Sequence, residues 1–334
     1  MEELGEPQFR ANQIFSWIHK KNVCEFDRMS NLPRNLVSKL EKRFILNPLK
    51  DVGSQKSKDG TTKFLLELED GHTIETVLIP SGKRFTLCLS SQLGCKIRCP
   101  FCVSGSHGFL RNLKTSEIAG QVLAARRAGY YSITNIVYMG IGEPLDNFDN
   151  VIESVRLINS REGINIGARH ITISTCGIVP GIRRLKNTGL QTGLSVSLHA
   201  TSDELRNRLV PVNRKYPLKE LLKACSDYRQ SSGRTVTLEY ALMSGINDSV
   251  EEARELARIT KKINAKINLI PCNPNRSSEY QGAGKDILSA FKKTIESAGA
   301  RITLRNTKGR AILAACGQLA FDRKEAGPTT PASG

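Results

Sequence analysis

Residues 86–102 read Thr-Leu-Cys-Leu-Ser-Ser-Gln-Leu-Gly-Cys-Lys-Ile-Arg-Cys-Pro-Phe-Cys. A short β-rich run leads directly into three cysteines, Cys95, Cys99 and Cys102, at the spacing Cys-x3-Cys-x2-Cys. Three thiolates this close in sequence can reach one metal centre, and on a four-iron cluster they leave one iron open for a substrate or cofactor. A structural zinc ion normally takes four ligands, and His107 is the nearest side chain that completes a Cys3His set. The residues alone leave both sites open.

Short β-rich runs recur after this stretch, and helical patterns such as residues 218–230 and 249–263 separate them. The runs cover residues 135–140, 170–176, 193–200, 235–243 and 266–273. Strands that alternate with helices are typical of βαβ units around a parallel sheet. With the run at 84–92 there are six units, too few for a complete eight-stranded barrel. The sequence therefore predicts an α/β protein with a partial (βα)6 TIM-like barrel.

Two smaller parts precede the barrel. Residues 9–44 place apolar residues at helical spacing, which predicts a small helical domain. Residues 61–80 read as two strands around an Asp70-Gly71 turn, which predicts a β-hairpin extension. We expect a helical accessory domain at 1–46, the extension at 47–84, the barrel with its carboxyl-terminal segment at 85–318, and a loose tail at 319–334.

The composition narrows the partners and the compartment. The chain has 49 Lys plus Arg against 32 Asp plus Glu, a surplus of 17 positive charges that favours a nucleic acid over a merely solvated basic surface. There is no apolar run of membrane-spanning length, and the amino terminus resembles no export or transit signal, so a cytoplasmic protein is expected. Nine cysteines in a reducing compartment do not suggest a disulfide framework, so some should be ligands or reactive thiols.

Three cysteines after the first strand of a partial barrel resemble the radical S-adenosylmethionine (SAM) superfamily. Six ordered blocks narrow the likeness: SSQLGCKIRCPFC, VYMGIGEPLDN, HITISTCGIVPGI, SVSLHA, LIPCNP and AACGQLA. Together they resemble the RlmN family, dual-specificity methyltransferases of carbon 2 of adenosine in 23S ribosomal RNA (adenosine 2503) and transfer RNA (adenosine 37). The resemblance implies one [4Fe-4S] cluster on the three cysteines. It also implies two SAM molecules per turnover, one as methyl donor and one as radical source.

The same resemblance assigns the SAM contacts. They are Gly142, Glu143, Ser174, Ser197, Leu198, His199 and Asn273. Gly140-Ile-Gly142 could be mistaken for a dinucleotide-binding loop, but Pro144 and Leu145 break that fingerprint. Taken singly, each polar residue would more often simply end a strand, and His199 would more often be a satisfied core histidine.

A methyl carrier is needed because carbon 2 of adenine is electron-poor and cannot attack the SAM methyl group directly. In the family this carrier is a cysteine that matches Cys316, the S-methylcysteine intermediate, and the product leaves through a transient protein-RNA adduct. Cys88 matches the resolving thiol, which forms a transient disulfide with Cys316, and Glu75 matches the proton acceptor. Without the resemblance, Cys316 beside two alanines would be a small core residue, and Glu75 a solvent-facing strand residue.

The expected partners follow from charge and resemblance. Basic clusters and the helical domain would hold the RNA backbone, although each cluster could instead be a solvated helix face. The clusters are Arg183, Arg184 and Lys186; Arg206 and Arg208; and Arg214 and Lys215. An external one-electron reductant such as flavodoxin or ferredoxin is implied, and a monomer is expected. The alternatives are a sibling enzyme that methylates carbon 8 of the same ribosomal adenosine, and a non-catalytic, zinc-stabilised RNA-binding protein.

Overall fold

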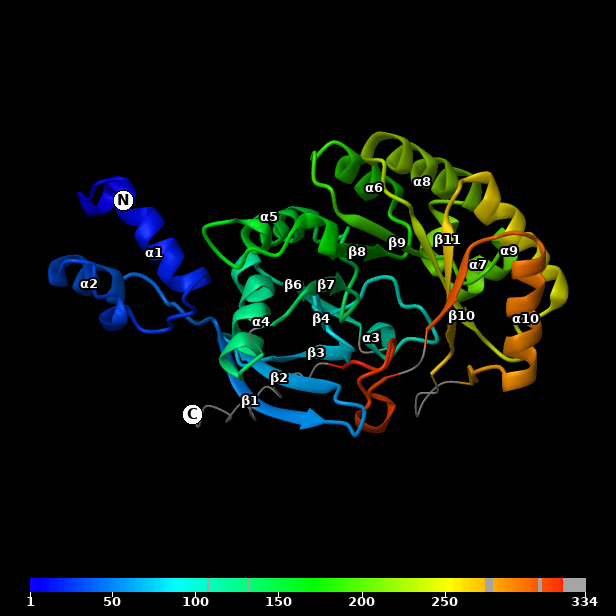
Figure 1. Cartoon of the computed structure of the whole chain (residues 1–334), viewed down its shortest axis with the longest axis horizontal. Helices are drawn as coiled ribbons and strands as arrows, with labels where there is room; N and C mark the ends of the chain where they lie inside the picture. The colour runs from blue at the N-terminus through cyan, green and yellow to red at the C-terminus, as the bar shows by residue number, and fades with distance from the viewer. Residues whose placement is uncertain (107, 131, 274–278, 306–307, 321–334) are drawn as a thin grey trace, which may run out of the picture.

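A mixed β-sheet is the backbone of the molecule. The computed structural model describes residues 1–106, 108–130, 132–273, 279–305 and 308–320, and within them ten strands form one sheet (Figure 1). The spatial order is β1-β2-β3-β4-β7-β8-β9-β10-β11-β12. The strands are β1 (Leu49–Lys56), β2 (Thr62–Leu68), β3 (Thr73–Ser81), β4 (Arg84–Cys88), β7 (Asn135–Tyr138), β8 (Ile171–Thr175), β9 (Gly193–Ser197), β10 (Thr237–Leu242), β11 (Lys266–Pro271) and β12 (Ile302–Leu304).

Within this sheet β4, β7, β8, β9, β10, β11 and β12 pair in parallel, each with the next, so the predicted α/β partial barrel is confirmed. The six predicted units begin at β4, β7, β8, β9, β10 and β11. The crossover helices are α4 (Thr115–Arg127), α5 (Phe148–Asn159), α6 (Val179–Lys186), α7 (Asp203–Leu209), α8 (Leu218–Ser232), α9 (Val250–Lys262) and α10 (Lys285–Ser297). A further strand, β12, was not predicted because it is short and mostly exposed.

Local chemistry explains individual elements. Helix α9 begins where the Ser249 hydroxyl accepts a hydrogen bond from the Glu252 amide, at 3.1 Å, as an N-cap does. Its inward stripe, which includes Ala253 and Leu256, is fully buried. In β9–β11 alternate side chains pack under the helices, whereas Glu239 and its strand neighbours meet on the barrel side. On that side Glu239 accepts hydrogen bonds from Ser195 and Asn268.

The hairpin extension joins the sheet directly. Strands β2 and β3 pair antiparallel around the predicted Asp70-Gly71 turn, and β3 also pairs antiparallel with β4. The extension therefore continues the barrel sheet at its first strand. Strand β1 was not predicted, because its sequence LKDVGSQK has little apolar content and only Leu49 is buried.

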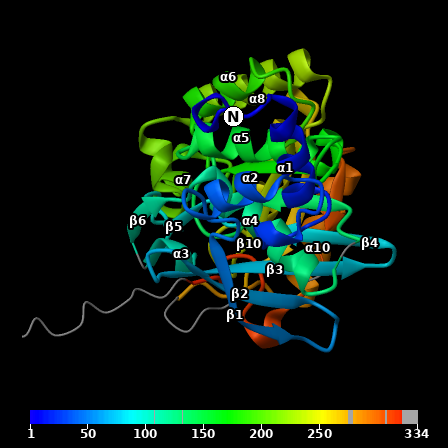
Figure 2. The same cartoon turned by 90° about the vertical axis from the view of Figure 1, so that its left-hand side faces the viewer.

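The amino-terminal helices lie at one end of the molecule, as Figures 1 and 2 show. Helices α1 (Phe9–His19) and α2 (Arg34–Glu41) belong to a module with its own small core of Leu4, Phe26, Met29, Leu32, Leu36 and Leu40. Polar bonds tie it to α4: Asn22 Nδ2 donates to the Leu123 carbonyl at 3.2 Å, and Asn22 Oδ1 accepts from Arg127 Nη1 at 3.4 Å. The domain limits given above stay a prediction, and residues 321–334 of the expected tail lie outside the described residues.

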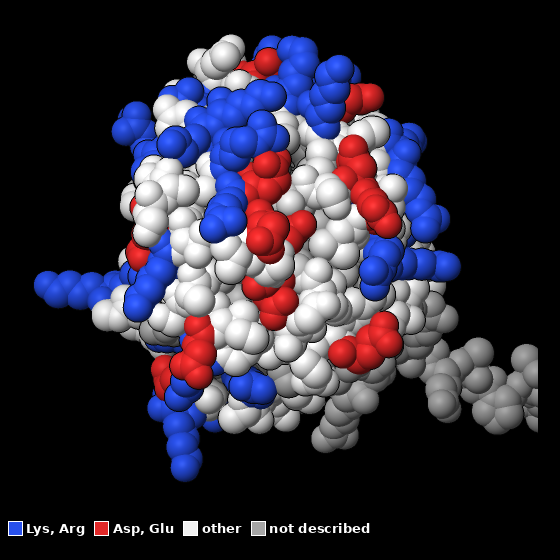
Figure 3. Space-filling view, turned by 90° about the vertical axis from the view of Figure 1, so that its right-hand side faces the viewer, with Lys and Arg blue, Asp and Glu red and all other residues white. Residues whose placement is uncertain are grey.

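The surface charge is uneven. On the face that carries α9 and α10, acidic side chains run down the middle, whereas Lys and Arg gather mainly towards the upper part and the edges (Figure 3). No helix among the described residues is long and apolar enough to cross a membrane.

Candidate functional site

The three motif cysteines lie on a loop that a small second sheet closes at its base. Strands β5 (Gln92–Gly94) and β6 (Phe109–Asn112) pair antiparallel on either side of it, and the Cys95 amide donates to the Gly108 carbonyl at 2.8 Å. Gly94 has a φ of 76°, and a Cβ there would lie 1.8 Å from the Gly108 oxygen. Only glycine allows this closure, so the loop leaves and re-enters the barrel at one fixed point.

The donor chemistry of this loop fits an iron-sulfur cluster. The side chains of Cys95, Cys99 and Cys102 line one cavity of about 160 Å³, and all nine cysteines of the chain are free. Burial raises the pKa of the Cys95 and Cys102 thiols, so a bound cation is needed to draw off their protons. Among the described residues, no three His, Cys, Asp or Glu side chains are placed so that they could share one metal ion. A four-iron cluster takes each thiolate on a different iron. His107 lies outside the described residues.

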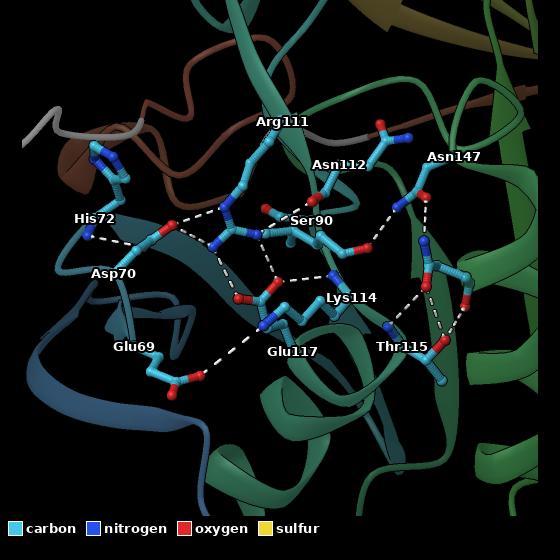
Figure 4. Close-up of polar contacts among 12 residues, drawn as sticks. Glu69, Asp70, His72, Ser90, Arg111, Asn112, Lys114, Thr115, Glu117 and Asn147 are labelled. Atoms are coloured by element: carbon cyan, nitrogen blue, oxygen red, sulfur yellow. Dashed lines mark hydrogen bonds and ion pairs between the residues drawn. The ribbon is translucent and has the colours of Figure 1, made fainter.

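A charged clamp holds the return strand of this loop (Figure 4). Arg111 of β6 binds the buried carboxylate of Glu117 on α4 with two parallel bonds, of 2.8 and 2.9 Å. Its Nε also donates to Asp70 Oδ2 at the β2–β3 turn, at 2.7 Å. One guanidinium therefore joins the cluster loop, the first barrel helix and the hairpin.

The loop after β7 carries Gly142 and Glu143. Gly142 has a φ of 102°, and a Cβ there would lie 2.5 Å from the Gln92 Cβ, so the loop rests directly on β5. Glu143 is buried, and its carboxylate accepts from the Leu145 amide at 3.0 Å and the Cys176 amide at 2.6 Å. Burial raises the pKa of Glu143, against the effect of these bonds. Both residues line the cysteine cavity.

Most of the other expected SAM contacts line this cavity as well. Ser174, Ser197, His199 and Asn273 do so from the ends of β8, β9 and β11. Leu198 differs: its side chain belongs to the main hydrophobic core, and its carbonyl accepts a hydrogen bond from Arg206 Nε. Leu198 is not part of the described cavity lining, so only its backbone is close to the other contacts.

His199 has a defined orientation and charge. It is a non-glycine residue in the left-handed region, with a φ of 58°, and its Nδ1 accepts the Ala241 amide at 3.0 Å. This bond leaves the proton of the neutral ring on Nε2. Burial, with a contribution from the nearby Arg206 cation, lowers the pKa of His199 to about 3. The imidazole is therefore neutral at physiological pH.

The two expected active cysteines come together from distant parts of the chain. Cys88 ends β4, and Cys316 lies in the carboxyl-terminal segment, where its carbonyl accepts from Asn273 Nδ2 at 3.3 Å. Both line a second, larger cavity of about 580 Å³, and Cys316 lines the cluster cavity too. Burial and the proximity of Cys316 raise the pKa of Cys88 to about 12.

Glu75 lies near the same carboxyl-terminal segment but outside both cavity linings as described. Its Oε1 is 2.6 Å from Lys63 Nζ, and its Oε2 accepts from the Ala320 amide at 2.9 Å. This carboxylate is buried and paired, not solvent-facing as the strand pattern alone would suggest.

Two charged residues of the site carried no assignment from the sequence. Arg305 follows β12 and lines both cavities together with Glu239 of β10. The Cys316 thiol, Glu239 and Cys88 together hold the pKa of Arg305 above its usual value. Glu239 accepts from Ser195 Oγ at 2.8 Å and Asn268 Nδ2 at 2.7 Å. The only signal in the sequence was one acidic residue inside an otherwise apolar strand.

The structure corrects one expected surface residue. Arg206, assigned to a basic RNA-holding cluster, is completely buried. Its guanidinium donates to the carbonyls of Leu198, Ser197 and Cys176, and to Asn213 Oδ1. Arg206 therefore supports the strand ends beneath the cavity and cannot contact RNA. The sequence could not reveal this, because a helical Arg-x-Arg pair is usually solvated.

Comparison with known proteins decides the family. Residues 89–257 match the family model described as the radical SAM superfamily, and residues 1–46 match the ribosomal RNA large subunit methyltransferase N-terminal domain. A protein of Halalkalibacterium halodurans named "Probable dual-specificity RNA methyltransferase RlmN" is 46% identical over 329 residues, which cover 97% of this chain and 91% of the relative. The chain belongs to the RlmN family of radical SAM methyltransferases.

Further relatives extend this result. An RlmN protein of Caldicellulosiruptor saccharolyticus is 45% identical and covers 96% of this chain and 92% of its own. The crystal structure of a radical SAM methyltransferase from Sphaerobacter thermophilus superposes with a TM-score of 0.90 at 43% identity, over 94% of both chains. Membership in the RlmN family makes the protein an enzyme with a [4Fe-4S] cluster and SAM as cofactors. The non-catalytic, zinc-stabilised alternative is set aside.

Proposed function

We propose that this enzyme methylates carbon 2 of adenosine in 23S ribosomal RNA and in transfer RNA, with Cys316 as the intermediate methyl carrier. The position of Cys316 carries the proposal. Cys316 lines both the cavity of the cluster cysteines and the second cavity, as a residue that carries a methyl group from one to the other must. The names of the relatives, dual-specificity RNA methyltransferases, support the choice of RNA substrates.

The cofactor side is assigned to the first cavity. A [4Fe-4S] cluster with SAM supplies the one-electron chemistry that activates an unpolarised methyl group. Cys95, Cys99 and Cys102 would hold the cluster. The SAM contacts would be Gly142, Glu143, Ser174, Ser197, His199 and Asn273, with the backbone of Leu198. The neutral His199 offers a donor at Nε2, and Glu143 an acidic partner for the SAM ammonium group.

The substrate side is assigned to the second cavity. Its volume is in the range of small-molecule sites, and its lining is polar along the inner barrel face. Basic residues on the lining are Arg84, His170, Lys266, Arg305 and Lys308. Cations at its rim suit the phosphates that flank an extruded nucleotide. We therefore assign the target adenine to this cavity.

Two residues would complete the reaction next to Cys316. Cys88 shares the second cavity with Cys316, which supports its role as the resolving thiol. Its raised pKa keeps it protonated until it is needed, so its attack requires a base. Glu75 is assigned as the proton acceptor, supported by its bond to the Ala320 amide four residues after Cys316. A flavodoxin- or ferredoxin-type reductant, a monomer and a cytoplasmic location remain predictions.

The test is an anaerobic assay of the reconstituted enzyme on both RNAs, with mass spectrometry of the nucleosides. We expect 2-methyladenosine from each RNA; 8-methyladenosine alone would instead support the sibling activity. Cys316→Ala should abolish RNA methylation and still cleave SAM. Cys225→Ala is the control, because Cys225 is buried in α8 and lines neither cavity. RNA methylation by Cys316→Ala would disprove the carrier role.

A further inference from the structure

Gln92 connects the cluster loop with the loop after β7. It lies in β5, three residues before Cys95, and is completely buried. Its Oε1 accepts the Glu143 amide at 2.8 Å, and its Nε2 donates to Asp146 Oδ2 and Asn112 Oδ1, both at 2.8 Å. Both donors of this amide are used, and its oxygen is bonded.

Backbone contacts also hold the cluster loop and the loop after β7 together. The backbone N–H of Gln92 donates to the Ile141 carbonyl at 3.2 Å, and a side chain at Gly142 would collide with Gln92. Asp146, at the far end of the loop, is also 3.0 Å from Lys96 Nζ, next to the first cluster cysteine. The loop after β7 is therefore attached on both sides of Cys95.

A separate tie makes the two loops one unit without Gln92. Asn147 Nδ2 donates to the carbonyls of Ser91 and Leu113, each at 2.8 Å, and Figure 4 shows Asn147 reaching towards the base of the cluster loop. Removal of the Gln92 amide should therefore leave the fold intact. What it removes is the side-chain bond from the cluster loop to the Glu143 amide, and one of the two bonds that hold Asp146 to that loop.

We propose that Gln92 is a positioning residue for SAM, which sets the distance between the cluster loop and the Gly142–Glu143 segment. The inference rests on the proposed assignment of Gly142 and Glu143 as SAM contacts. One SAM molecule must reach the open iron and this segment at the same time, so the gap between the two loops has to match its length. A shift of about 1 Å in such a site is enough to weaken binding strongly.

The test compares the loss of polar groups from two buried side chains, one between the two loops and one away from both cavities. Gln92→Met removes the bridge with little change in shape. Tyr228→Phe is the control: Tyr228 is 1% exposed, its hydroxyl donates to the Thr192 carbonyl just before β9 at 2.8 Å, and it lines neither cavity. SAM dissociation constants are measured by equilibrium dialysis on reconstituted, anaerobic protein without RNA, alongside iron content and melting temperature.

We expect Gln92→Met to raise the SAM dissociation constant at least tenfold with unchanged iron content, and Tyr228→Phe to change it less than twofold. Gln92→Glu, which keeps the acceptor and loses both donors, should also weaken binding. Normal SAM affinity of both Gln92 variants, or an equal loss in Tyr228→Phe, would overturn the inference. Loss of iron from Gln92→Met would also overturn it, because the amide would then hold the cluster. Wild-type protein that binds no SAM would instead disprove the proposed function.

Discussion

The Arg111 clamp predicts a large stability cost for one substitution. Arg111→Met removes two charge-assisted bonds to Glu117, whose side chain is only 3% exposed, and leaves that carboxylate without its cation. Breaking a buried ion pair costs about 3–5 kcal/mol, and Arg111 itself is 29% exposed, so we take the lower end, about 3 kcal/mol. At about 2 °C per kcal/mol for a chain of this size, the melting temperature should fall by about 6 °C.

The partner substitutions separate the two arms of the clamp. Asp70 is 39% exposed, so Asp70→Asn should cost at most about 1 kcal/mol. Glu117→Gln removes the buried charge, so the double variant with Arg111→Met should be more stable than the sum of the single effects by about 2 kcal/mol. Urea unfolding of the wild type, Arg111→Met, Glu117→Gln and the double variant measures this coupling, and the same assay on Asp70→Asn measures the exposed arm. A cost below about 1 kcal/mol for Arg111→Met, or a coupling near zero, would refute the reasoning.

Three further predictions follow from individual contacts. The pKa of His199 is about 3 in the folded protein and 6.5 in the unfolded chain, so only the unfolded state takes up a proton as the pH falls below 6.5. Between pH 7.5 and 5.0 the free energy of unfolding of the wild type should therefore fall by about 2 kcal/mol more than that of His199→Gln. Urea unfolding at both pH values measures this difference. Gly142→Ala should lower both stability and SAM affinity, whereas Gly167→Ala, whose added Cβ meets nothing closer than 3.6 Å, should leave both unchanged in melting and dialysis experiments. Arg206→Met should lower the free energy of unfolding by about 3–5 kcal/mol, because Arg206 is completely buried. Arg184→Met, on the exposed side of α6, should lower it by less than about 0.5 kcal/mol. Similar melting temperatures of the two variants would contradict the burial argument.

The barrel could be predicted because its signal is periodic and local. Each predicted parallel strand is an apolar run followed by a helical pattern, and the structure contains all six of these units. Strands β1 and β12 lack that signal: β1 is exposed at every position after Leu49, and β12 has three residues, of which two are exposed. Their pairing is decided by a neighbouring strand edge, which no local pattern reports.

The site was predictable only where a residue type is itself chemically unusual. Three cysteines within eight positions predict a metal-binding loop without a structure. Arg206, Gln92 and Arg305 are ordinary polar residues in sequence, and their importance arises from what surrounds them after folding. Arg206 shows the limit most clearly, because burial among three carbonyls reversed its expected role from RNA contact to internal support.

Cys316 lies outside any helix or strand, and its defined position comes from hydrogen bonds of the carboxyl-terminal segment. Its backbone is bonded to three separate parts of the molecule: the Val103 amide on the cluster loop donates to the Gly317 carbonyl at 2.9 Å, Asn273 donates to the Cys316 carbonyl, and the Ala320 amide donates to Glu75 on the hairpin. Each bond comes from a part to which a different task is assigned: cluster, SAM and proton transfer. Under the proposed function a methyl carrier must keep a fixed position relative to all three parts, and a segment bonded to each of them meets that requirement without belonging to a helix or strand.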